Sequence, residues 1–137
     1  MRKLFISFVV IICIGFSASA QQITRQFPIP NAPQSLEVNY INHVPLNGDN
    51  GTLEFINPSD QAFRVHVVVS VKIKWTEQSE SNPIPIKKTK TLILCDDDFD
   101  IARHDRITYS QSNRGLIKGG PHKPNKTYEY DIQLTFK

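Results

Sequence analysis

The chain has 137 residues, of which 39% are hydrophobic and 21% charged, with 16 basic and 13 acidic side chains. This length predicts a single domain. The hydrophobic content excludes a wholly disordered chain, and nine prolines with six glycines are too few for a collagen-like one.

The N-terminal segment 1–20 predicts a secretory signal peptide. Arg2 and Lys3 give it a positive start, residues 4–16 are mostly apolar, and Ala18-Ser19-Ala20 supplies the small side chains that signal peptidase accepts. As a helix the apolar run would span about 20 Å, too short for a bilayer core of about 30 Å. We therefore expect cleavage near Ala20-Gln21, a secreted or periplasmic protein, and no membrane span in the mature chain.

Cleavage changes the charge and the cysteine count. Removing Arg2 and Lys3 leaves 14 basic residues against 13 acidic ones, a net charge of +1. Nearly neutral charge argues against nucleic-acid partners, because a basic face normally supplies most of that affinity. Cys13 is also lost, so Cys95 cannot form an internal disulfide and the domain must depend on its core. Because Leu92-Ile93-Leu94 lead into Cys95, we expect a buried thiol.

Residues 21–33 predict an extended N-terminal arm. Pro28, Pro30 and Pro33 interrupt this segment at short intervals, which favours a polyproline-like conformation. Such an arm either lies along a sheet edge or stays loose until a partner binds it.

The clearest secondary-structure signal lies in residues 63–75. Every second residue from Phe63 to Trp75 is apolar, and five of the six residues between them are polar. A period of two predicts a strand with one face on a core. At about 3.3 Å per residue it would span about 40 Å, so we expect a bend or bulge.

The same alternation returns in residues 128–136, and weaker strands are predicted at 36–41, 52–56, 88–94 and 106–109. Turn-forming residues separate them at 47–51, 57–60 and 119–121, and residues 79–85 predict a polar loop. About six to eight strands without helices predict an all-β, antiparallel two-sheet sandwich of the immunoglobulin-like type over residues 34–137. The predicted core comprises Leu36, Val38, Leu53, Phe55, Phe63, Val65, Val67, Val69, Val71, Ile73, Trp75, Leu92, Leu94, Tyr130, Ile132 and Leu134.

The most unusual segment is acidic. Asp96, Asp98 and Asp100 alternate as the first ligands of a calcium loop do, which makes them candidate calcium ligands. The glycine and the bidentate glutamate of an EF-hand are missing. The alternative is a solvated acidic turn over residues 96–105 that pairs with neighbouring lysines.

Enzyme motifs are scarce. The chain has no Gly-x-Ser-x-Gly elbow and no glycine-rich phosphate loop. Cys95 and His104 could act as nucleophile and base, or as zinc ligands, but no third orienting group or second ligand pair has a recognisable spacing. We predict no catalytic residues and no cofactor, with calcium as the one candidate ion.

Basic side chains form two groups in the sequence. The first is Lys72, Lys74, Lys87, Lys88 and Lys90, and the second is Arg114, Lys118, Lys123 and Lys126. They either protect exposed strand edges or bind a charged partner, including further copies of the chain. Trp75, Tyr128 and Tyr130 are core positions by phase, with a sugar-stacking platform of Trp75 and the tyrosines as the alternative. Asn50 and Asn125 match the glycosylation pattern.

These observations favour an exported, non-enzymatic β-sandwich module that binds a protein or glycan partner or has a structural role. One alternative is a carrier of a lipid or other apolar ligand between the sheets. The other is a hydrolase that uses Cys95, His104 and the acidic cluster.

Overall fold

The computed structural model describes residues 21–43, 51–110, 117–118, 120 and 125–137. The predicted signal peptide, Asn50, Arg114 and Lys123 lie outside these residues. The described residues form seven strands, which are β1 (Gln21–Pro28), β2 (Ser35–Asn42), β3 (Gly51–Ile56), β4 (Phe63–Ser79), β5 (Asn82–Ile101), β6 (Arg106–Ser110) and β7 (Thr127–Phe136).

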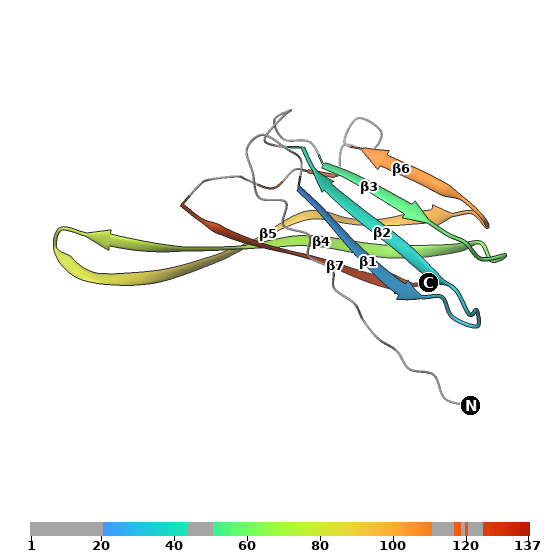
Figure 1. Ribbon diagram of the computed structural model, residues 1–137, viewed down its shortest axis with the longest axis horizontal. Coiled ribbons are helices and arrows are strands. Elements are labelled where there is room, and N and C mark those ends of the chain that lie inside the picture. The colour runs from blue at the N-terminus through green and yellow to red at the C-terminus, as the bar shows by residue number, and fades with distance from the viewer. Residues whose placement is uncertain (1–20, 44–50, 111–116, 119, 121–124) are drawn as a thin grey trace.

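The strands form two antiparallel sheets that face each other (Figure 1). One sheet has the order β1-β2-β3-β6, and the other has the order β5-β4-β7. Alternate side chains of each strand point between the sheets and form one hydrophobic core. The prediction of an all-β protein with two antiparallel sheets is confirmed.

The core follows the predicted alternation closely. Val69 is fully buried, whereas its neighbour Val68 is only partly covered. Among the predicted core residues, Phe63, Trp75, Leu92, Tyr130 and Leu134 are partly buried and pack against the core, and the others are buried. The prediction missed further buried residues, which are Ile23, Ile29, Tyr40, Phe99, Ile101 and Ile117.

Residues 21–28 of the predicted N-terminal arm form strand β1 at the edge of the first sheet. β1 pairs with β2 from Gln21 opposite Asn42 to Pro28 opposite Ser35, and it buries Ile23. Arg25 reaches from this edge to β7, where its guanidinium donates to the Asp131 carboxylate and to the Ile132 carbonyl at 2.9 Å. The sandwich therefore begins before residue 34. Of the two alternatives for the arm, the structure has the one in which it lies along a sheet edge.

Strand β5 is much longer than the predicted 88–94. Residues 79–85 are not a polar loop, because β4 continues to Ser79 and β5 starts at Asn82. Pro83 and Pro85 fit here because β5 is an edge strand, where a missing backbone N–H breaks no ladder. The prediction of an acidic turn that starts at Asp96 is also wrong, since β5 extends through the aspartates to Ile101.

A bend or bulge was expected in residues 63–75, but the extra residue lies in the partner strand, as a bulge in β5 at Leu94. Val69 lies opposite Cys95, but the next residue, Ser70, lies opposite Ile93. Leu94 and Cys95 are consequently both buried, and Ile93 is 54% exposed on the outer face. The Leu94 carbonyl accepts a hydrogen bond from the Lys118 amide at 3.0 Å. The bulge reverses the phase of β5, so that the aspartates at even positions face outward.

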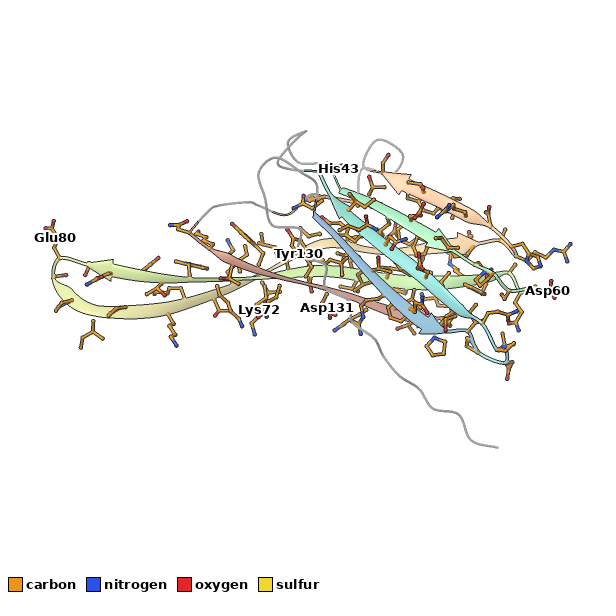
Figure 2. The ribbon with its side chains drawn as sticks, viewed as in Figure 1. His43, Asp60, Lys72, Glu80, Tyr130 and Asp131 are labelled. Carbon is orange, nitrogen blue, oxygen red and sulfur yellow. The ribbon has the colours of Figure 1, made fainter. Side chains whose placement is uncertain are left out.

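Beyond the core, β4 and β5 continue as a two-stranded ribbon. The pairing of β7 with β4 ends at Thr127 opposite Lys74. From there residues 75–88 project from the sandwich as what we call the β4–β5 extension (Figure 1). Figure 2 shows Glu80 at its tip and Asp60 at the opposite end of the molecule.

Candidate functional site

The predicted acidic site is a ladder of charges across three strands. Asp96, Asp98 and Asp100 lie on the outward face of β5, opposite Val68, His66 and Arg64 of β4. The His66 imidazole lies between two carboxylates, with Nε2 at 2.7 Å from Asp96 Oδ1 and Nδ1 at 2.6 Å from Asp98 Oδ1. Arg64 contacts Asp100 at 3.1 Å, and Lys137 contacts Asp98 at 3.2 Å.

This arrangement favours the charged forms of its members. The hydrogen bond to Asp98 raises the pKa of His66, and the contact with Asp96 adds to that effect. His66 and Lys137 in turn lower the pKa of Asp98. Protonated His66 can donate from both ring nitrogens, which is what two flanking carboxylates require. The segment's negative charge is thus offset across the strands.

The geometry adds no support for calcium. Alternate residues of a strand are about 7 Å apart, whereas a calcium ion needs converging oxygens at about 2.3–2.6 Å. Within the described part of the chain, no group of three or more His, Cys, Asp or Glu side chains is placed to hold a metal ion. Calcium binding at Asp96, Asp98 and Asp100 stays a prediction, which thermal melts in calcium chloride and sodium chloride of equal ionic strength would test.

Cys95 and His104 are not brought together. Cys95 is buried at the bulge and forms no disulfide within the described part of the chain. His104 lies beyond the far end of β5, about 20 Å along the strand from Cys95 to Ile101. There it is mostly exposed, has a φ of 54°, and its Nε2 contacts the Asp60 carboxylate. The described residues therefore do not pair Cys95 with His104.

A different cluster lies where the extension leaves the sandwich. Eight residues line a shallow hollow of about 590 Å³, which we call the lysine hollow: Lys74, Trp75, Thr76, Lys87, Lys88, Thr89, Asn125 and Thr127. Antiparallel pairing brings them together, since Lys74 lies opposite both Thr89 and Thr127, and Trp75 lies opposite Lys88.

The lysine hollow is cationic. Lys74 Nζ contacts Glu129 Oε1 at 2.8 Å, and this contact lowers the pKa of Glu129. Lys87 and Lys88 form no ion pair with any residue that the structure describes. A further ammonium, that of Lys126, lies 4.5 Å from the centre of the Trp75 ring.

Part of this cluster was visible in the sequence. The sequence pointed to the first basic group, to Trp75 and, as a glycosylation acceptor, to Asn125, but not to Thr76 and Thr89. Threonine carries no distinctive pattern, and only the pairing of β4 with both β5 and β7 shows that these side chains share one hollow.

Comparisons with protein-family models and with curated proteins find no match for this chain. The described residues contain no helix long and apolar enough to cross a membrane.

Proposed function

We propose that the protein is an exported, non-enzymatic β-sandwich module that binds an acidic partner, protein or glycan, through the base of the β4–β5 extension. The observation that carries this proposal is the extension itself. It projects beyond the core and presents Ile84 and Ile86, which are 70% and 46% exposed. Large exposed apolar side chains on a projecting element are suited to contact with a partner.

The charge at the base of the extension indicates which kind of partner would bind there. Glu77 and Glu80 lie toward the tip of the extension. Five lysines lie at its base, which are Lys72, Lys74, Lys87, Lys88 and Lys90. A surface of one sign favours a partner of the opposite sign and speeds its association. An acidic partner therefore fits the base, and the isoleucines of β5 provide apolar contact beside it.

The sandwich serves as the scaffold in this proposal. Two packed antiparallel sheets support an immunoglobulin-like architecture in the broad sense only. In the first sheet β1, β2 and β3 are successive neighbours. The immunoglobulin constant type instead has the order A-B-E-D in one sheet. Buried side chains occupy the space between the sheets, which gives the carrier alternative no support.

The test replaces residues 75–88 with Asn-Gly, a two-residue turn that closes the hairpin between the paired Lys74 and Thr89. The replacement removes two lysines and two glutamates, so the net charge is unchanged. We expect the intact chain to be retained on poly-glutamate or on acidic polysaccharide beads and released by salt. The variant keeps Lys72, Lys74 and Lys90 but loses Lys87, Lys88 and the exposed isoleucines, so it should elute at lower salt than the intact chain while keeping a cooperative thermal transition.

Equal retention of the intact chain and the folded variant would overturn the proposal. So would the failure of the intact chain to bind any of these acidic matrices at low salt.

A further inference from the structure

We infer that the lysine hollow is a binding site for an anionic saccharide, a sugar unit that carries a carboxylate or a sulfate. This inference rests on the proposed function and narrows its partner to one chemical class. Two properties of the lining residues support it, their charge and their mixture of polar and aromatic groups.

The charge selects an anion. Lys74, Lys87 and Lys88 line the hollow, and none of its eight lining residues is acidic. Glu129 engages Lys74 from outside the lining, which leaves Lys87 and Lys88 as the ammonium groups without an ion-pair partner among the described residues. Because successive residues of a strand face opposite sides, Lys87 lies on the face of Thr76 and Lys88 on the face of Trp75. An anion in the hollow would therefore offset the charge of an ammonium group on one of these faces.

The remaining lining residues suit a sugar better than a bare anion. Thr76, Thr89 and Thr127 offer hydroxyls, and Asn125 offers an amide, all of which can both donate to and accept from sugar hydroxyls. The Trp75 indole adds apolar surface, and its Nε1 donates to Glu77 Oε1 at 3.0 Å, which fixes the ring. A volume of about 590 Å³ falls within the range of small-ligand sites.

The competing explanation is that these lysines only discourage sheet-to-sheet association along an edge strand. That role depends on charge along the whole extension and not on one hollow. It predicts that removing any two of the five lysines Lys72, Lys74, Lys87, Lys88 and Lys90 has the same effect on binding. The two explanations therefore differ in a measurable way.

Trp75 is the only tryptophan of the chain, so its fluorescence reports directly on the hollow. The intact protein is titrated with galacturonate oligomers, with sulfated dextran oligomers and with neutral galactan oligomers of matched size. We expect a saturable change with at least one anionic saccharide and none with the neutral one. The first two arms distinguish carboxylate from sulfate.

Two variants of equal charge locate the site. Lys87→Gln with Lys88→Gln removes two lysines from the hollow, and Lys72→Gln with Lys90→Gln removes two from the same ribbon outside it. We expect the first pair to weaken saccharide binding about tenfold, since two exposed contacts together contribute on that order. The second pair should weaken it less than about threefold.

Equal losses in the two variants, equal binding of the neutral oligomer, or no saturable change would each overturn the inference. Poly-glutamate separates this failure from that of the proposed function. If poly-glutamate binds and no anionic saccharide does, the binding module stands and the saccharide site falls. If neither binds, both fall.

Discussion

His66 is the residue whose charge the fold controls most directly. Asp96 and Asp98 flank its ring, Arg64 and Lys137 complete the surroundings, and the nearest carboxylate holds its pKa above the usual value of 6.5. The stabilisation from a raised histidine pKa is present below 6.5 and is lost as pH rises through the raised value. The lowered pKa of Asp98 acts oppositely, since its contribution is present above 3.8 and is lost in acid.

The two shifts together predict a pH window for this interaction. Replacing His66→Gln should lower the free energy of unfolding most at about pH 5, and the difference from the intact chain should shrink toward about pH 8. Chemical denaturation at several pH values measures this difference. His43→Gln is the control, because His43 contacts the Thr52 hydroxyl at 3.0 Å and no carboxylate of the described residues. If the loss of unfolding free energy in His66→Gln stays constant or grows with pH, the interaction of His66 with Asp96 and Asp98 is contradicted.

Asn57 shows what turn chemistry does and does not reveal. Its side-chain oxygen accepts hydrogen bonds from the Ser59 amide at 3.0 Å and the Ser59 hydroxyl at 2.7 Å, as the Asn-Pro-Ser sequence predicts for a turn. Its amide also donates to the Ala102 carbonyl at 2.9 Å, which ties this turn to the one after β5. That second role depends on a distant segment and leaves no local pattern.

At the scale of single strands, regular alternation made β4 and β7 predictable. β5 was largely missed because its prolines and its run of aspartates are typical of loops. Both are tolerated for reasons outside the segment: the prolines lie on an edge, and the aspartates face cations on β4. The bulge at Leu94 depends on Lys118, which is also distant in the sequence.

Strand β1 makes a prediction of its own. Because Ile23 is 5% exposed, Ile23→Ala should lower the free energy of unfolding by about 2–5 kcal/mol, the usual range for shortening a buried isoleucine. Gln26→Ala, at an exposed position of the same strand, should change it by no more than about 0.5 kcal/mol. Denaturation curves measure both. Similar small losses would mean that residues 21–28 are not part of the core sheet in solution.

At the scale of the whole molecule, the protein has two parts that differ in packing. Two facing sheets bury a continuous core, and Arg25 joins β1 to β7 at one side of it. The extension lies outside this core, and an isolated hairpin of this kind is only marginally stable in water. The candidate site lies between the two parts. Sequence periodicity predicted the sheets, but the length of the extension and the hollow at its base follow from long-range pairing.

The central claim is that the extension binds and the sandwich supports it. Amide hydrogen exchange, measured with and without an excess of poly-glutamate or galacturonate oligomers, tests this claim most directly. In the free protein, amides of residues 75–88 should exchange much faster than those of β2 and β3, because few buried contacts hold them. Adding the acidic probe should slow exchange in residues 72–90 and leave β2 and β3 unchanged. Protection that appears elsewhere, or nowhere, would contradict the account.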